Sequence, residues 1–94
     1  MAASCPWQSL GAYLREARHR TDFTQYQIAR QLGITQAAYS QIERGLIRPR
    51  PALLLPLVLL LGLSLLQVVT LAGYPIDEVI TANTQPVREK TRLA

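Results

Sequence analysis

Apolar residues in the first half of the chain recur at steps of three and four, which places them on one face of a helix. This spacing predicts a first helix over residues 9–20, with Ser9 as its N-cap. Two further apolar faces predict short helices over residues 25–32 and 36–44. The second half differs in kind, because no charged residue occurs from residue 51 to residue 76.

The second and third predicted helices meet at a short turn that favours a tight junction. Gly33 can adopt the positive φ that a tight helix exit needs, and Thr35 can accept hydrogen bonds from free N–H groups of the next helix. Thr24 and Gln27 have the spacing of a capping box that begins the second helix at Gln25. Two helices joined in this way are typical of a helix-turn-helix.

The outer face of the 36–44 helix has side chains that can read bases. Gln36 has the donor and acceptor pair that fits N6 and N7 of adenine, and Ala37 offers a methyl surface suited to the methyl group of thymine. Ser40 and Gln41 can reach further along the major groove. A solvated polar face is the alternative interpretation of Gln36, Ser40 and Gln41.

Phosphate contacts position such a unit on DNA, and helix N-termini and arginines are suited to make them. Thr24 and Gln25 stand at the N-terminus of the second helix, where free N–H groups and the helix dipole attract a phosphate. Thr35 has the same place in the third helix. The arginines that we expect at neighbouring phosphates are Arg44, Arg48 and Arg50, the last also within reach of the minor groove.

These residues resemble the phage-repressor helix-turn-helix family, also described as the Cro and repressor or xenobiotic-response-element type. The resemblance covers roughly residues 9–73 without an insertion. It extends beyond the junction to Leu10, Leu14, Arg15, Arg18, Glu43, Arg44, Gly45, Pro49, Gly62 and Ser64. The chain departs from the family at Tyr39, where Ile or Val is usual, and in a leucine-rich fourth helix where polar residues usually alternate.

The resemblance implies an all-α, five-helix fold of the lambda-repressor type over residues 9–73. An N-terminal arm over residues 1–8 and a C-terminal tail over residues 74–94 complete the chain, and we expect residues 84–94 to be disordered. In the resembled family, a glutamine at the place of Gln25 bonds the DNA backbone and braces Gln36. The family pairing also implies a largely buried ion pair between Arg18 and Glu43.

The uncharged run has two interpretations. At about 20 residues it is long enough to span a bilayer, but Pro56, Gly62 and a second capping box at Ser64 and Gln67 argue against a single span. We favour a fourth helix that starts between residues 52 and 55, with Pro56 in its first turn, and a fifth that ends near residue 72. The short stretch from residue 77 to residue 80 fits either a helix or a strand.

Two soluble helices over this run leave more apolar surface than a monomer usually exposes. A second copy of the chain or a protein partner would cover it. The residues expected on this surface are Leu53, Leu59, Leu60, Leu66, Ile76, Val79 and Ile80.

Charge and composition narrow the function classes. The 94 residues carry a net charge of +4, and residues 1–50 hold seven arginines against three acidic residues, an excess equal to that net charge. A basic half favours DNA as a partner. The lone Cys5 allows no internal disulfide, and the single His19 has no companions at ligand spacing, so we expect no metal and no cofactor. The sequence offers no pair of side chains that could serve as a general acid and a general base, so nothing in it suggests an enzyme.

The sequence thus predicts a sequence-specific regulator that binds double-stranded DNA through the 36–44 helix. We expect a repressor that binds a palindromic operator as a homodimer, and a cytoplasmic location because the start of the chain lacks the features of a signal peptide. The alternative is a protein-interaction module that uses the leucine-rich surface to hold a toxin, a polymerase subunit or a phage factor. A membrane-tethered regulator is a minor alternative.

Overall fold

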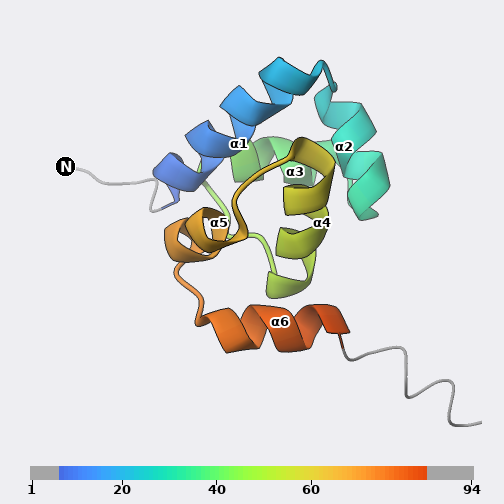
Figure 1. The fold of residues 1–94 in the computed structure, drawn as a ribbon. Coiled ribbons are helices and arrows are strands. Elements are labelled where there is room, and N and C mark those ends of the chain that lie inside the picture. The colour runs from blue at the N-terminus through green and yellow to red at the C-terminus, as the bar shows by residue number, and fades with distance from the viewer. Residues whose placement is uncertain (1–6, 85–94) are drawn as a thin grey trace, which may run out of the picture.

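The computed structural model describes residues 7–84, and over this range the chain forms helices and no strand (Figure 1). The helices are α1 (Gln8–Thr21), α2 (Gln25–Leu32), α3 (Gln36–Glu43), α4 (Pro51–Leu61), α5 (Leu65–Ala72) and α6 (Ile76–Thr84). The all-α prediction is confirmed. The count of helices differs from the prediction, because the start of the tail folds into α6. Cys5 and the predicted disorder after Thr84 lie outside the described residues.

Two predicted helix starts are wrong. Trp7 occupies the N-cap of α1 and makes no side-chain cap, so Ser9 lies inside the helix. Pro51 takes the first position of α4, where the fixed φ of proline suits a helix and its missing N–H costs no hydrogen bond. Pro56 therefore lies in the interior of α4 and not in its first turn.

The predicted junction between α2 and α3 is confirmed in detail. The Thr24 hydroxyl accepts from Gln27 N at 3.1 Å, and the Gln27 side chain accepts from Thr24 N at 2.9 Å, which completes the capping box. Gly33 ends α2 at φ 74°. Thr35 then caps α3 by accepting from Ala38 N at 3.0 Å. Both helix starts are thus fixed by residues next to them in the sequence.

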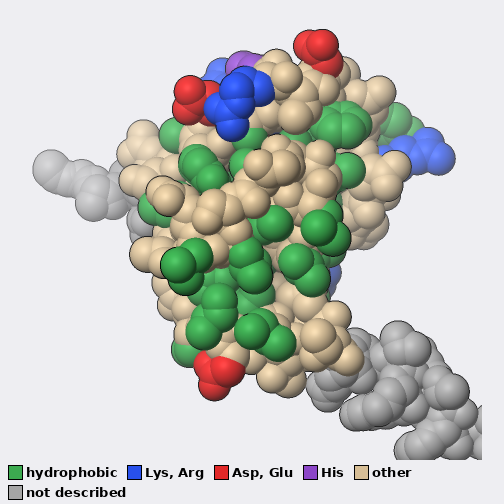
Figure 2. Space-filling view, viewed as in Figure 1, with side chains coloured by type: hydrophobic (Ala, Val, Ile, Leu, Met, Phe, Trp, Pro, Cys, Tyr) green, Lys and Arg blue, Asp and Glu red, His purple; other side chains and the backbone are tan. Residues whose placement is uncertain are grey.

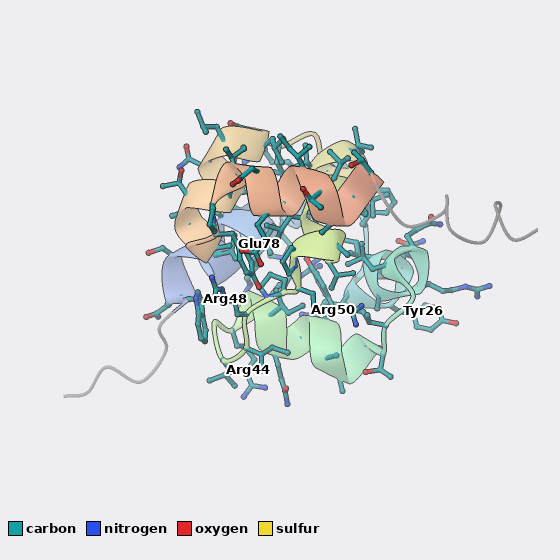
Figure 3. The ribbon with its side chains drawn as sticks, turned by 90° about the horizontal axis from the view of Figure 1, so that it is seen from below. Tyr26, Arg44, Arg48, Arg50 and Glu78 are labelled. Carbon is teal, nitrogen blue, oxygen red and sulfur yellow. The ribbon has the colours of Figure 1, made fainter. Side chains whose placement is uncertain are left out.

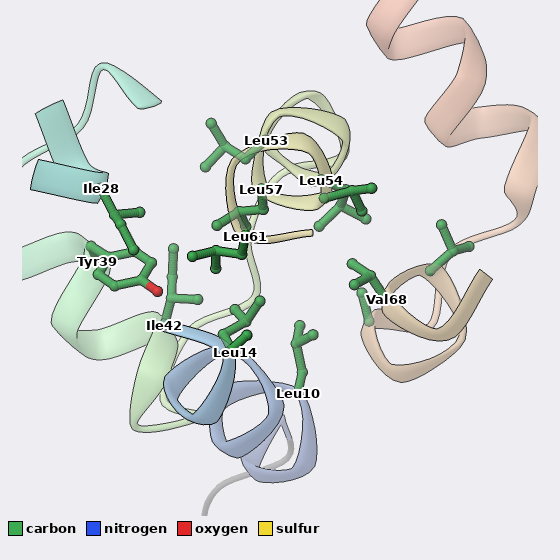
Figure 4. Close-up of a cluster of buried hydrophobic side chains, with 14 of the residues drawn as sticks. Leu10, Leu14, Ile28, Tyr39, Ile42, Leu53, Leu54, Leu57, Leu61 and Val68 are labelled. Atoms are coloured by element: carbon green, nitrogen blue, oxygen red, sulfur yellow. The ribbon is translucent and has the colours of Figure 1, made fainter. Parts of the chain in front are cut away.

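The core forms where α4 passes between the other helices. Helix α4 packs against α1, α2, α5 and α6, while α3 packs on α1 and α2 (Figure 1). Figure 4 shows the apolar side chains that meet there from α1 to α5. The largest fully buried ones are Tyr39, Leu10, Leu14, Ile28, Leu54, Leu57, Val68 and Val79, together with Pro49.

Two residues predicted on the apolar surface belong instead to this core. Leu53 is only 7% exposed, because α4 is surrounded and buries more than one of its faces. Val79 is 1% exposed, because α6 packs on α4. Leu60 is half-buried against the core. The prediction that Leu53 and Val79 are available to a partner is therefore wrong.

The uncharged run is divided between two helices. α4 ends at Leu61, Gly62 adopts φ 66°, and α5 begins at Leu65 after its N-cap Ser64. The Ser64 hydroxyl accepts from Gln67 N at 3.3 Å. None of the helices within residues 7–84 has both the length and the apolar character needed to cross a bilayer.

Candidate nucleic-acid interface

The outer face of α3 is open within the described part of the chain. Tyr39 and Ile42 point into the core, whereas Gln36, Ala37 and Gln41 are exposed and Ser40 is half-buried. In Figure 3, α3 lies on the other side of the domain from α6, and no helix of residues 7–84 covers its outer side. The four residues predicted to read bases are therefore not packed in the interior.

A buried ion pair holds α3 against α1. Arg18 Nε lies 2.6 Å from Glu43 Oε2, and Arg18 Nη2 donates to Glu43 Oε1 at 3.1 Å. The side chains of Arg18 and Glu43 are only 13% and 2% exposed. Arg18 Nη1 also donates to the carbonyl of Phe23 at 3.2 Å, so the segment that joins α1 to α2 is bonded to the same arginine. The predicted pairing of Arg18 with Glu43 is confirmed.

Gln25 joins the same network from α2. Its amide nitrogen donates to Glu43 Oε1 at 2.9 Å, and the side chain is half-buried. Glu43 thus accepts hydrogen bonds from α1 and α2 while it belongs to α3. The sequence assigns this amide to a DNA phosphate and to Gln36, but in the structure it turns toward Glu43. Gln25 therefore helps to fix the orientation of α3.

The charge of Glu43 depends on these donors. Burial acts to raise the pKa of Glu43, but the hydrogen bonds from Arg18 and Gln25 outweigh it and hold this pKa below its ordinary value. Tyr39 lies beside the pair, and its buried hydroxyl has no hydrogen-bond partner within the described residues. Burial, with the neighbouring charge of Glu43, raises the pKa of Tyr39, so the phenol stays neutral.

The depressed pKa of Glu43 predicts acid sensitivity. Its contribution to stability is fully present above the unfolded-state pKa of about 4.3 and is lost as the pH falls through the lower folded-state value. We expect the free energy of unfolding of the wild type to fall more steeply below about pH 4.3 than that of Glu43→Gln. Urea unfolding of both proteins over this range measures it. Identical pH dependence would contradict the role given to Glu43.

The residues predicted at phosphates have different environments. Thr24 and Thr35 are exposed, and their hydroxyls serve as caps at the N-termini of α2 and α3. Arg44 and Arg50 are exposed at the two ends of the segment that joins α3 to α4. Neither guanidinium donates a hydrogen bond within residues 7–84. Arg48 is exposed too, but its guanidinium donates to the carbonyls of Ala72 and Gly73 at the end of α5. Two of the three arginines are thus free to meet a phosphate.

A family model described as a helix-turn-helix domain matches residues 9–71, about two thirds of the chain. The chain belongs to this helix-turn-helix family. The match spans α2, the turn at Gly33 and the exposed outer face of α3, so DNA binding is the functional class of this domain. Neither the comparison with curated proteins nor the comparison with solved structures gave a match.

Sequence reasoning missed one residue that the helix-turn-helix domain depends on. Gly11 lies in α1 where this helix crosses α3, and a Cβ atom there would lie 2.7 Å from the carbonyl carbon of Glu43 and 2.8 Å from the carbonyl oxygen of Ile42. Only glycine permits this approach. A glycine inside an otherwise apolar helical pattern is the signal that would have found it.

The prediction that the chain holds no metal concerns clusters of side chains that could bind one. Within residues 7–84, no three side chains of His, Cys, Asp or Glu come together as a possible metal site. His19 is exposed on α1. The outer face of α3 and the residues beside it expose amides, hydroxyls and guanidinium groups, which are the groups that contact bases and phosphates.

Proposed function

We propose that this protein is a sequence-specific regulator of transcription that reads double-stranded DNA with α3. Gln36 is the main base-reading residue, with Ala37, Ser40 and Gln41 further along the groove. Arg44, Arg50 and the N-termini of α2 and α3 hold the neighbouring phosphates. The observation that carries the proposal is the exposed outer face of α3 on a rigid support, the network of Arg18, Gln25 and Glu43.

We further propose that the regulator acts as a homodimer on a palindromic operator in the cytoplasm and represses by blocking access of RNA polymerase. Large apolar side chains gather over α4, α5 and α6 in Figure 2. Leu59 is 74% exposed and Leu66 66%, and Ile76 and Ile80 are also exposed. A monomer seldom leaves so many apolar side chains in contact with water. A second copy bound there would cover them and leave the outer face of α3 uncovered.

The assignment of Gln36 can be tested by selecting bound duplexes from a random pool. Wild-type protein is expected to select two inverted half-sites about one helical turn, roughly 34–36 Å, apart. Gln36→Ala is expected to lose about 1–3 kcal/mol of discrimination at one adenine of each half-site, because the bidentate amide contact is absent. Binding to duplexes that vary at single positions measures this loss.

A matched control is Gln31→Ala, which changes an exposed glutamine on α2 and is expected to leave the base preference unchanged. If Gln36→Ala keeps the full sequence preference of the wild type, the assignment of base reading to Gln36 is wrong.

The exposed apolar side chains also favour a second candidate function, a module that holds another protein. In this case Leu59 and Leu66 would contact the partner and α3 would contact DNA weakly or not at all. An electrophoretic assay at low salt separates the two candidates. A regulator is expected to retard random genomic fragments through its phosphate contacts, and an interaction module is not.

A further inference from the structure

Arg48 is exposed, but two kinds of contact fix its guanidinium to the domain. Its Nε donates to the carbonyl of Ala72 at 2.9 Å and its Nη2 to the carbonyl of Gly73 at 3.0 Å. These carbonyls end α5, where the helix dipole favours a cation. The guanidinium carbon also lies 3.8 Å from the centre of the Tyr74 ring, within range of a cation–π contact. Arg48 thus fastens the segment between α3 and α4 to the end of α5.

The same segment is fastened at the residues on both sides of Arg50. The Tyr74 hydroxyl donates to the carbonyl of Pro49 at 2.8 Å, and Pro49 is fully buried. On the other side, the Asn83 amide donates to the carbonyl of Pro51 at 3.1 Å. Residues 48, 49 and 51 are therefore each bonded to the α5–α6 part of the chain. Arg50 itself is exposed, and its side chain donates no hydrogen bond within residues 7–84.

We infer that Arg48 and Tyr74 are positioning residues, which fix the segment between α3 and α4 so that Arg50 is presented to a DNA phosphate. The inference rests on the proposed function and changes the role that the sequence suggests for Arg48. In the structure the guanidinium of this arginine, labelled in Figure 3, donates to the carbonyls of Ala72 and Gly73 at the end of α5. Pro49 and Pro51 restrict the backbone on either side of Arg50, and the bonds from Tyr74 and Asn83 orient it.

Two substitutions separate positioning from direct contact. Tyr74→Phe removes the bond to Pro49 without changing any charge. Arg48→Lys keeps the positive charge but cannot bond both carbonyls in the planar geometry of a guanidinium. If Arg48 touched a phosphate directly, the lysine would largely replace it. If Arg48 positions Arg50, both substitutions weaken DNA binding by the same route.

The experiment measures binding of the full chain to a fluorescein-labelled mixed-sequence duplex by anisotropy over a range of salt concentrations. Arg50→Gln is expected to lower the slope of log K against log salt by about 0.9, because one phosphate contact is lost. Tyr74→Phe and Arg48→Lys are each expected to bind roughly three- to tenfold more weakly than wild type at low salt. Their salt slopes are expected to shift toward that of Arg50→Gln.

A double-mutant cycle makes the coupling measurable. Adding Tyr74→Phe to Arg50→Gln is expected to weaken binding less than twofold further, because the contact that Tyr74 supports is already absent. The matched control is Tyr13→Phe, which removes a hydroxyl that accepts from Ser64 N at 3.3 Å and does not bond the segment between α3 and α4. It is expected to bind DNA like wild type. Melting temperatures establish that each variant is folded at the temperature of the assay.

The outcomes that overturn the inference differ from those that overturn the proposed function. Wild-type affinity and slope in both Tyr74→Phe and Arg48→Lys would show that the segment needs no such support. An unchanged slope in Arg50→Gln would remove the contact that is said to be positioned. If Tyr74→Phe does not fold, Arg48→Lys and Asn83→Ala give the same comparison. Failure of the proposed function would appear as no salt-dependent binding by the wild type.

Discussion

Arg18→Ala is expected to lower the free energy of unfolding by about 3–5 kcal/mol, because it strands the charge of Glu43 in the interior. Glu43, whose side chain is 2% exposed beside Arg18, would keep only the hydrogen bond from Gln25. A domain of this size is stable by about 5–15 kcal/mol, so this loss would be a large share of its total stability. Urea unfolding at neutral pH gives the difference from wild type.

The control for Arg18→Ala is Arg15→Ala, which removes the same charge from an exposed position of the same helix. This change is expected to stay within about 0.5 kcal/mol of wild type. Arg18→Ala combined with Glu43→Ala is expected to cost less than the sum of the single changes, because no unpaired charge is left. A loss below about 1 kcal/mol for Arg18→Ala would contradict the account of the pair as buried.

Gly11→Ala is expected to destabilise the domain by about 3 kcal/mol, the upper end of the usual cost of overpacking, although alanine normally favours a helix by about 1 kcal/mol. The added methyl group would meet the backbone of Ile42 and Glu43, which cannot rotate away as a side chain can. To make room, α1 and α3 would have to move apart, which would also stretch the Arg18–Glu43 pair. Chemical denaturation and the melting temperature measure the loss.

A matched control is Ser9→Ala, which also places alanine in α1 but at an exposed position. It is expected to be neutral or slightly stabilising, as helix propensity alone predicts. If Gly11→Ala is as stable as Ser9→Ala, α1 and α3 do not approach each other as closely as the structure shows.

The junction of α2 and α3 could be predicted because its determinants are local. The capping box of Thr24 and Gln27 and the left-handed Gly33 each act within a few residues of the sequence. The ion pair of Arg18 and Glu43 spans 25 residues, and only the resemblance to a family pointed to it. Helix propensity and spacing carry no information about such a pairing.

The parts that could not be predicted depend on contacts between distant segments. The spacing of Leu53 and Val79 predicts surface positions. In the structure both are buried, because α4 has neighbours on several sides. The partners of Arg48 are backbone carbonyls 24 and 25 residues away, which leave no mark in the residue types. The residue types around Arg48 predict a phosphate contact, and they give no sign of the bonds that its guanidinium makes within the domain.

The central claim is that the outer face of α3 lies in the major groove of DNA, and titration of isotope-labelled protein with its selected duplex tests it most directly. The side-chain amide signals of Gln36 and Gln41 are expected to shift, with saturation at one duplex for each pair of chains, while the methyl signals of buried Leu57 stay in place. Amide signals of Gln36 and Gln41 that remain unmoved while signals of α4 to α6 shift would contradict the claim.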